Sequence, residues 1–461
     1  MTLIKSISGI RGTIGGKTNE NFTPIDIVKF IAAYGGWLQK TQPAKSLKVI
    51  IGRDARISGI MVSQLVCATL QGMGIDVIDL GLSTTPTVEM MVTHFNASGG
   101  VILTASHNPK EWNALKLLNQ KGEFINENEG KFIIELAEKE SFEFSTVDEL
   151  GKYETFSEAI ELHINKILEL PYVDIQAIKN KQFKVVIDAV NSTGGIAIPR
   201  LLDKLGVSYS KLYCEPNGEF PHDPEPLEKN LTEIAKKVKE VSADFGIVVD
   251  PDVDRLALIN EDGTMFGEEY TLVAIADYLL PIIKSNTVSN LSSSRALKDV
   301  TEKHGFSYFA SAVGEVNVVE KMKEVEAKIG GEGNGGIILA DLHYGRDALV
   351  GIALFLSLLA KKNISATSLK NSYPQYFMAK EKIELKPETN VDKILEEVIR
   401  LNKTENINIT DGVKIDFENE WVHLRKSNTE PIIRIYSEST SLQKANELAQ
   451  RFIKIITSVS E

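Results

Sequence analysis

Short apolar segments alternate with helix-like segments along the N-terminal part of the chain, and this alternation restricts the fold more than any other feature of the sequence. Strands are expected at residues 48–51, 75–80 and 100–103, and the first and last of these segments are mainly apolar, as in buried strands. Helices are expected at residues 25–40, 59–72 and 87–95, the first of them ending at Gly35-Gly36 or shortly after. Because parallel strands need a crossover between them, this order predicts a parallel α/β domain with loops at the strand ends.

The pattern repeats farther along the chain, which at 461 residues is too long for one hydrophobic core. Residues 183–188 resemble residues 47–51 and begin a second strand-helix unit, and another buried strand ends at Asp250. From about residue 375 the order becomes strand, helix and then several strands, which predicts a small α+β domain with an antiparallel sheet. We expect four domains, at residues 1–152, 153–255, 256–370 and 371–461.

Composition argues against several classes of protein. The formal net charge of −12 is unfavourable for general nucleic-acid binding, although locally concentrated basic groups could still bind a phosphorylated small substrate. No apolar run approaches the length of a membrane span, and the first residues lack the apolar core of a signal peptide. With Cys67 and Cys214 alone, neither a disulfide framework nor a thiolate metal site is expected. We therefore expect a cytoplasmic protein without membrane or nucleic-acid partners.

Residues 104–109, with the sequence Thr-Ala-Ser-His-Asn-Pro, follow the apolar run that ends at Leu103, and we call them the serine loop. Asn108-Pro109 disfavours continued helix or strand and predicts an exposed turn. The turn would present the hydroxyl of Ser106 beside the imidazole of His107. By itself the hexapeptide is also compatible with an ordinary turn.

Residues 250–255, the aspartate loop, carry the sharpest chemical signal. Asp250, Asp252 and Asp254 follow a buried strand and project on one side if the segment stays extended. Three converging carboxylates repel one another and need a hard cation, most simply Mg²⁺. A calcium loop is the rival interpretation, but Arg255 stands at its sixth position, where glycine is needed, and strands rather than helices flank the segment.

Residues 330–336, the glycine loop, combine five glycines with Glu332 and Asn334. Glycines let the backbone approach a ligand, while the carboxylate and the amide offer hydrogen bonds to hydroxyl groups. The spacing does not match the dinucleotide or phosphate-loop fingerprints. The glycine loop therefore favours a hydroxyl-rich ligand, with a flexible turn as the plainer alternative.

Residues 425–431, the arginine loop, concentrate hydrogen-bond donors between two expected strands. The donors that suit a phosphate oxyanion are Arg425, Ser427, Asn428, Thr429 and, just beyond the loop, Arg434. Near the N-terminus Arg11 lies between Gly9 and Gly12, in a segment expected to be a loop, where glycines also suit an anion. A solvated hairpin and a plain turn are the alternatives for these two segments.

Each of the four loops alone has a plainer interpretation, and only their combination indicates a function. Successive segments of one chain carry a candidate nucleophile, a candidate cation site, side chains suited to sugar hydroxyl groups and side chains suited to a phosphate. Together they predict a phosphorylated polyol that reacts beside a serine and a divalent cation.

At this point the residues resemble the α-D-phosphohexomutase superfamily across essentially the whole chain. The serine loop, the aspartate loop, residues 331–335 of the glycine loop and the arginine loop match, in order, the family's phosphoserine, metal, sugar and phosphate loops. The resemblance implies three topologically similar α/β domains plus a C-terminal α+β domain, with the active site in a central cleft. Length and the segment around Glu332 are most similar to the bacterial and archaeal phosphoglucosamine mutase / phosphomannomutase branch.

The resemblance also implies a mechanism. Ser106 carries a phosphoryl group, Ser106 and the three aspartates hold Mg²⁺, and a hexose or hexosamine phosphate passes through a 1,6-bisphosphate intermediate. It implies that the phosphoserine is supported by Arg11, His107, Lys116 and Arg255. It implies that the substrate is bound by Glu332, Asn334, Arg425, Ser427, Asn428, Thr429 and Arg434.

Two departures from the family pattern concern proton transfer. Ala312 and Gly336 stand where many relatives carry a lysine and a histidine. His107 is then the remaining candidate for general acid–base chemistry in a matched motif, with His343 as a further one. The arginine loop also has Lys426 and Asn428 where proline and glycine are commoner.

The substrate and the reaction class leave alternatives. The leading hypothesis is a phosphoglucosamine mutase that interconverts glucosamine 6-phosphate and glucosamine 1-phosphate. The alternatives are a phosphomannomutase/phosphoglucomutase of the same mechanism, a serine-dependent sugar phosphate phosphohydrolase and a non-catalytic sugar-phosphate-binding protein. Nothing in the sequence distinguishes a monomer from a homodimer.

Overall fold

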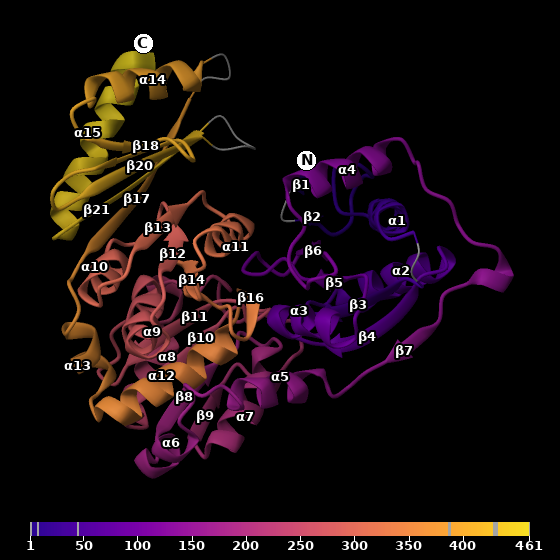
Figure 1. Cartoon of the computed structure of the whole chain (residues 1–461), viewed down its shortest axis with the longest axis horizontal. Coiled ribbons are helices and arrows are strands. Elements are labelled where there is room, and N and C mark those ends of the chain that lie inside the picture. The colour runs from indigo at the N-terminus through magenta and orange to yellow at the C-terminus, as the bar shows by residue number, and fades with distance from the viewer. Residues whose placement is uncertain (1, 7–8, 44–45, 386–388, 427–431, 461) are drawn as a thin grey trace. The chain divides into compact units, whose positions relative to one another are not determined.

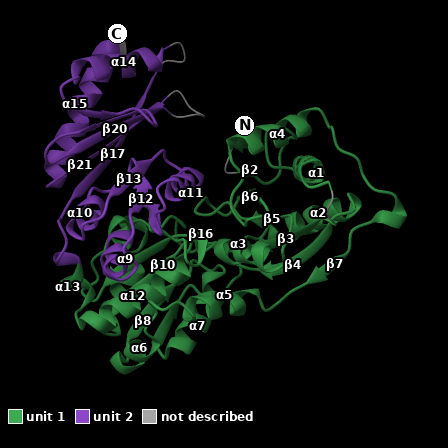
Figure 2. Ribbon diagram, viewed as in Figure 1, with its two compact units in different colours: residues 1–271, 334–369 green, residues 272–333, 370–461 purple. Residues whose placement is uncertain are grey.

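The computed structural model describes residues 2–6, 9–43, 46–385, 389–426 and 432–460. The chain folds into two compact units (Figure 2), of which the first holds residues 1–271 and 334–369 and the second holds residues 272–333 and 370–461. Three α/β domains and a C-terminal α+β domain are present, which confirms the expected fold class. Among the described residues, no helix has the length and apolar character needed to cross a membrane.

The first sheet has the strand order β1-β2-β6-β5-β3-β4-β7 (Figure 1). Its strands are β1 (Ile4–Ser6), β2 (Gly9–Thr13), β3 (Lys48–Arg53), β4 (Asp76–Leu82), β5 (Gly99–Leu103), β6 (Trp112–Leu118) and β7 (Tyr153–Thr155). β3, β4, β5 and β7 pair in parallel, but β6, β2 and β1 join through antiparallel pairings. The expectation of a parallel sheet is wrong for these three strands. The connection from Leu103 to Trp112 holds no helix, so the chain returns beside β5 instead of crossing over.

Helices cover both faces of this sheet. α1 (Pro24–Thr41), α2 (Gly59–Gly72) and α4 (Glu127–Glu138) share one hydrophobic core, and α3 (Thr85–His94) belongs to a second. In β3, Val49 and Ile51 pack into the first core and Ile50 packs into the second. Burial on both faces accounts for the continuous apolar run that predicted this strand.

Helix α1 matches the expected residues 25–40, but it does not end at Gly35-Gly36. It runs through Gly35 and Gly36 to Thr41. A Cβ atom at Gly35 would lie 2.7 Å from Sδ of Met73. The absence of a side chain therefore lets the helix approach Met73 closely, which is a packing role and not a signal that the helix ends.

The second sheet has the order β11-β10-β8-β9. Its strands are β8 (Lys184–Asp188), β9 (Ser208–Leu212), β10 (Phe245–Val249) and β11 (Leu256–Asn260), and its region also contains α5 (Ala159–Leu168), α6 (Ile175–Lys181), α7 (Gly194–Leu205) and α8 (Thr232–Glu240). β11 runs antiparallel to β10. The aspartate loop is thus the turn of a hairpin, and the sheet continues to Asn260, past residue 255. Short 3₁₀ helices lie at Val147–Glu149 and Glu228–Asn230.

The remainder of the first unit is a hairpin followed by a helix. β15 (Gly336–Leu339) and β16 (His343–Arg346) pair antiparallel, and α12 (Ala348–Lys362) follows, with α13 (Ala366–Asn371) beyond it. α12 packs against α5, α6 and α7. The polar segment between β16 and α12 is thereby held close to the second sheet.

In the second unit, β12 (Thr287–Asn290) pairs in parallel with β13 (Tyr308–Ser311) and β14 (Ile329–Glu332). The accompanying helices are α9 (Glu268–Ile283), α10 (Ala296–Lys303) and α11 (Glu315–Glu324). Gly330, Gly331 and Glu332 belong to β14, so the glycine loop is strand in its first part and a turn only afterwards.

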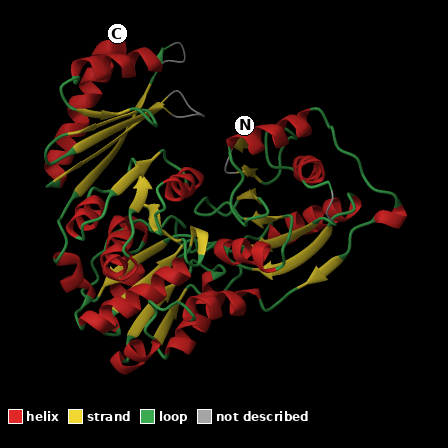
Figure 3. Cartoon of the chain, in the orientation of Figure 1, coloured by secondary structure: helices red, strands yellow, loops and turns green. Residues whose placement is uncertain are grey.

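The C-terminal sheet has the antiparallel order β17-β21-β20-β19-β18, and α14 and α15 lie on one of its faces (Figure 3). The elements are β17 (Phe377–Glu384), α14 (Val391–Leu401), β18 (Asn406–Asn408), β19 (Val413–Asp416), β20 (Trp421–Lys426), β21 (Ile432–Ser439) and α15 (Leu442–Ser460). This arrangement confirms the predicted α+β domain and its antiparallel sheet.

Candidate active site

The serine loop begins where β5 ends. Ser106 has a left-handed backbone with φ of +49°, a conformation that costs a residue with a side chain roughly 1–3 kcal/mol. The Ser106 N–H donates to Oγ1 of Thr104 over 2.9 Å, and this Oγ1 donates to Oδ2 of Asp54 over 2.6 Å. These hydrogen bonds hold the strained turn that presents the Ser106 hydroxyl.

A buried guanidinium binds the carbonyl groups of the serine loop. Nη2 of Arg56 donates to the carbonyl oxygens of Ser106 and Asn108 over 2.5 and 2.6 Å. Its Nη1 donates to the carbonyl oxygen of Pro109 over 2.6 Å. Its Nε donates to Asp54 Oδ2 over 3.0 Å, and both side chains of this ion pair are buried. Asp54 and Arg56 therefore support the serine loop from the end of β3.

The aspartate loop converges through a turn instead of an extended segment. Val253 has φ of +64°, which is rare for a β-branched residue and marks a tight reversal. One carboxylate oxygen from each of Asp250, Asp252 and Asp254 lies within 4.8 Å of the other two, and all three residues are buried. The structure therefore brings the predicted triad together, although by a different backbone geometry.

The serine and the triad meet directly. Oγ of Ser106 donates a hydrogen bond to Oδ2 of Asp250 over 2.6 Å. Burial, together with the charges of Asp254 and Asp252, raises the pKa of Asp250 well above its usual range. Two loops that are distant in sequence thus form one polar centre inside the first unit.

The chemistry of the triad fits a hard metal ion. Oδ1 of Asp252 and Oδ1 of Asp254 are buried, and neither accepts a hydrogen bond from any of the described residues. Carboxylate oxygens at such spacing are the ligands that Mg²⁺ and Ca²⁺ prefer. The orphaned oxygens are those that a bound cation would satisfy.

Cationic side chains surround the triad. Nζ of Lys116 lies 2.7 Å from Asp252 Oδ2 and 3.5 Å from Asp254 Oδ2. Burial alone lowers the pKa of Lys116, but these carboxylates outweigh it and raise the pKa. Nη2 of Arg346 donates to Asp254 Oδ2 over 2.6 Å. Burial alone raises the pKa of Asp254, but Arg346, Lys116 and Arg255 outweigh it and lower the pKa.

Two further predicted residues lie near this centre. The Arg255 N–H donates to Asp250 Oδ1 over 3.2 Å, and its Nε lies 3.9 Å from Asp254 Oδ1. Arg11 is in strand β2 and not in a loop, and its cross-strand partner on β6 is Ala114. Because cross-strand partners share a face, Arg11 lies on the same face of the sheet as Lys116.

The two candidate imidazoles have different surroundings. Nδ1 of His107 lies 3.4 Å from Ser106 Oγ, and burial and the charge of Arg255 lower the pKa of His107 to about 2. The ring is therefore neutral at physiological pH. His343 contacts Asp347 and Glu89 instead, at 3.4 and 3.2 Å.

The glycine loop is anchored to the aspartate hairpin within the first unit. The carbonyl oxygen of Gly335 accepts from the N–H of Leu256 over 3.0 Å, and the φ of Gly335 is +85°. A Cβ atom at Gly336 would lie 2.2 Å from Cδ of Arg346. Oδ1 of Asn334 accepts from the Gly336 N–H over 3.1 Å. The place of the side chain that Gly336 lacks is thus taken by Arg346, whose guanidinium reaches Asp254.

Glu332 ends β14 in the second unit. Its Oε1 accepts from Nδ2 of Asn290 over 2.9 Å and from the Gly314 N–H over 3.1 Å. The residue is buried. These bonds fix one oxygen of the carboxylate to the two neighbouring loops.

The arginine loop and β21 bring two guanidinium groups together. Arg425 on β20 and Arg434 on β21 are direct cross-strand partners, and Lys382 on β17 is the next partner of Arg434. Nε of Arg425 lies 2.8 Å from Asp411 Oδ2. Like charges directly opposite each other are unfavourable, so this cationic row favours an anion. The predicted Ser427, Asn428 and Thr429 lie outside the described residues.

Four residues that contact the serine or aspartate loop were not identified from the sequence. Asp54 and Arg56 follow β3, a strand parallel to β5, and this shared edge could have indicated their role. Thr85 donates from Oγ1 to Asp252 Oδ2 over 2.6 Å. Neither Thr85 nor Arg346 lies in a recognisable motif, because each reaches the triad through the packing of separate segments.

The fold and the site together indicate an α/β enzyme that handles an anionic group beside a metal ion. Models of the phosphoglucomutase/phosphomannomutase family match the chain in order. Alpha/beta/alpha domain I matches residues 3–144, domain II residues 161–263, domain III residues 267–376 and the C-terminal domain residues 381–455.

Curated relatives match over nearly the full length. A phosphoglucomutase/phosphomannomutase of Thermococcus kodakarensis is 35% identical, with 96% of this chain and 98% of the relative covered. A phosphoglucosamine/phosphogalactosamine mutase of Sulfurisphaera tokodaii is 33% identical, with 97% and 98% covered. The chain therefore belongs to the phosphoglucomutase/phosphomannomutase family and is a phosphohexomutase, an isomerase that transfers phosphate.

Solved structures agree on the fold. A phosphoglucomutase/phosphomannomutase family protein from Burkholderia thailandensis has a TM-score of 0.84 at 22% identity, with 99% of each chain covered. Parafusin, a phosphoglucomutase from Paramecium in its open form, has a TM-score of 0.81 at 19% identity, with 98% of this chain and 95% of that chain covered.

Proposed function

We propose that the chain is a phosphoglucosamine mutase, which interconverts glucosamine 6-phosphate and glucosamine 1-phosphate through a phosphoserine at Ser106 and a 1,6-bisphosphate intermediate. The observation that carries the proposal is the 2.6 Å hydrogen bond between Ser106 Oγ and a buried triad of carboxylates. The full-length relative named phosphoglucosamine/phosphogalactosamine mutase supports the choice of a 2-amino sugar.

Asp250, Asp252 and Asp254 would hold Mg²⁺ together with the phosphate on Ser106. The orphaned Oδ1 atoms of Asp252 and Asp254 and the burial of all three residues fit an oxygen-liganded cation. When bound, the ion withdraws negative charge from the phosphoryl group.

The protein's own groups orient and balance the charge of the transferring phosphoryl. In the forward step a hydroxyl oxygen of the substrate forms a bond to phosphorus as the bond from phosphorus to Ser106 Oγ breaks; the substrate hydroxyl gives up its proton and Ser106 Oγ gains one, so that the serine is released as a free hydroxyl. Lys116, Arg255 and Arg346 place positive charge around the triad where the phosphate oxygens would lie. Arg56 keeps the backbone of Ser106 in place during transfer. Arg11 lies on the same sheet face as Lys116 and would extend this positive region.

The substrate phosphate that does not react would bind the cationic row of the C-terminal domain. Arg425 and Arg434 are adjacent cross-strand partners, and paired guanidinium groups suit the oxygens of a phosphate. We include Ser427, Asn428 and Thr429 in this site as hydroxyl and amide donors. The residues proposed for the sugar hydroxyls are Glu332 and Asn334, and their loop connects the two units of the chain.

A phosphomannomutase/phosphoglucomutase of the same mechanism is the second candidate. The Thermococcus kodakarensis relative carries that name at 35% identity. The residues described at the site bind phosphate and metal in the same way for either sugar, so the choice depends on contacts to the substituent at carbon 2.

Turnover of glucosamine, mannose and glucose phosphates, measured side by side after priming with a hexose 1,6-bisphosphate, tests the proposal. A kcat/KM for glucosamine phosphates at least about tenfold above the others, equal to about 1.4 kcal/mol in the transition state, is expected. Higher values for mannose or glucose phosphates would transfer the proposal to the second candidate. Free phosphate without isomerisation would contradict both.

A further inference from the structure

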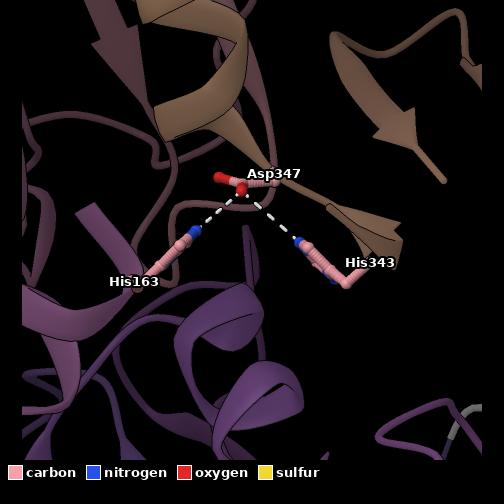
Figure 4. A group of neighbouring side chains, drawn as sticks. All are labelled: His163, His343 and Asp347. Atoms are coloured by element: carbon pink, nitrogen blue, oxygen red, sulfur yellow. Dashed lines mark hydrogen bonds and ion pairs between the residues drawn. The ribbon is translucent and has the colours of Figure 1, made fainter. Parts of the chain in front are cut away.

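Two histidines and an aspartate meet inside the first unit, and none of them belongs to the aspartate loop (Figure 4). His163 comes from α5, His343 from β16, and Asp347 immediately precedes α12. His163 and Asp347 are fully buried, and the His343 side chain is 12% exposed. Segments distant in sequence thus bring three metal-ligating side chains to one point.

The atoms are disposed as ligands of one ion. Nε2 of His163 and Nε2 of His343 both face Oδ2 of Asp347, at 2.8 and 3.4 Å, and the three atoms lie within 4.8 Å of one another. Zinc bonds of about 2.0–2.2 Å to nitrogen and oxygen place neighbouring tetrahedral ligands about 3.3 Å apart. The two distances from imidazole nitrogen to Asp347 Oδ2, 2.8 and 3.4 Å, therefore lie within about half an ångström of this spacing.

The outer atoms of the same side chains are already oriented. Nδ1 of His163 is 2.9 Å from Oγ1 of Thr87, and Nδ1 of His343 is 3.2 Å from Oε2 of Glu89. Oδ1 of Asp347 accepts the backbone N–H groups that begin α12. A hydrogen-bond partner on the far nitrogen, as Thr87 supplies to His163, is characteristic of metal-ligating histidines, whereas the contact of His343 with Glu89 is a close charge contact.

The charge of the cluster also favours a cation. Glu89 and Asp347 are both buried carboxylates. Burial alone lowers the pKa of His343, but hydrogen bonds to Asp347 and Glu89 outweigh it and raise the pKa to about 10. Two buried carboxylates beside the imidazoles thus place negative charge where a divalent cation would bind.

We propose that His163, His343 and Asp347 form a binding site for a divalent transition metal of the zinc class, separate from the magnesium-type triad. Two imidazole nitrogens select zinc-like ions, whereas the three carboxylates of the triad select hard cations. Water completes the coordination, reaching the ion past the partly exposed ring of His343.

The proposed ion is structural. Arg346 and Ala348 flank Asp347, and they contact the aspartate loop through the bond to Asp254 and through an N–H donated to the carbonyl oxygen of Val253 over 3.2 Å. Fixing Asp347 to α5 and β16 therefore fixes the segment that holds Arg346 against the triad.

The test uses the full chain, stripped with a chelator and titrated with Zn²⁺ in excess Mg²⁺, with bound metal counted after gel filtration. We expect one equivalent of zinc and a higher thermal midpoint. His163→Gln and His343→Gln should each weaken zinc binding by about 100-fold or more, and Glu89→Gln by about 10–100-fold. His222→Gln is the matched control, because His222 meets a single carboxylate, Asp188, at 3.1 Å and should leave zinc binding unchanged.

X-ray absorption of the zinc-loaded wild-type protein keeps the proposal testable if the histidine variants do not fold. Two imidazole ligands on the bound zinc are expected. Failure of the wild-type chain to retain zinc in excess Mg²⁺, retention undiminished in both histidine variants, or a zinc shell of oxygens alone would each overturn the proposal.

Discussion

Replacing Gly336 by alanine tests how closely Arg346 is packed beside the triad. The new Cβ atom would lie 2.2 Å from Cδ and 3.0 Å from Cγ of Arg346, so the arginine side chain must move. Movement breaks the 2.6 Å hydrogen bond from Nη2 to Asp254 Oδ2. The substitution therefore acts on Asp254 without altering any residue of the aspartate loop.

The structure sets the size of the effect. A hydrogen bond to a charged group contributes roughly 1.5–3 kcal/mol. Lys116 and Arg255 stay near Asp254, at 3.5 and 3.9 Å. The loss should therefore remain below the roughly 3–5 kcal/mol of a buried charge that loses its sole partner. We expect Gly336→Ala to lower the free energy of unfolding by about 2 kcal/mol.

A double-mutant cycle separates this cause from general strain. In the Arg346→Ala background the same Gly336→Ala change should cost less than about 0.5 kcal/mol, which gives a coupling energy of about 1.5 kcal/mol. Urea unfolding monitored by tryptophan fluorescence supplies the four values. Gly72→Ala is the matched control, because its Cβ atom would meet only an ordinary contact, 3.4 Å from Phe144, and should change stability by less than about 0.5 kcal/mol. Equal costs of Gly336→Ala in both backgrounds would refute the reasoning.

Three further outcomes are expected. Ser106→Ala should remove both mutase turnover and the phosphoryl adduct in the intact mass, and an adduct that persisted would exclude Ser106 as the carrier. Arg425→Gln should raise KM for all hexose phosphates by about 10–100-fold, because one or two charge-assisted hydrogen bonds to the phosphate are lost. Glu332→Gln should instead change the preference among sugars. If Arg425→Gln changed only this preference, the proposed phosphate site would be contradicted. In metal-free protein, the pKa of His343 in the folded state is about 10, above its ordinary value of 6.5. Protonated His343 therefore contributes its full stabilisation of the folded chain below about pH 6.5, and this contribution is lost as the pH rises towards 10. Thermal midpoints should therefore fall more steeply over this range in the wild type than in His343→Gln, and parallel curves would contradict the raised pKa.

The serine and aspartate loops could be predicted because their signals are local. A buried apolar strand followed by a polar turn is readable from adjacent residues, and the structure places Ser106 and Asp250 at such strand ends. The pairing of Arg425 with Arg434 follows from a hairpin in the same way. Local patterns of this kind depend on few tertiary contacts.

Predictions failed where the packing of distant segments decided the outcome. Gly35 indicated a helix end, but the proximity of Met73 made it a packing site inside α1. Arg11 indicated a loop, but pairing with β6 made it part of a strand. From the sequence, a glycine required by a turn cannot be distinguished from a glycine required by close packing. The difference depends on which segment lies next to it in the fold.

The sequence by itself determined the α/β pattern, the order of the four loops and the kinds of side chain that we propose to bind metal and phosphate. These depend on periodicity and on chemistry carried within a few residues. The tertiary structure alone decided that Arg346 fills the space beside Gly336, that Arg56 binds the serine loop, and that His163 meets His343 at Asp347. Each of these contacts joins segments far apart in the chain, and their geometry arises only when separate elements pack together.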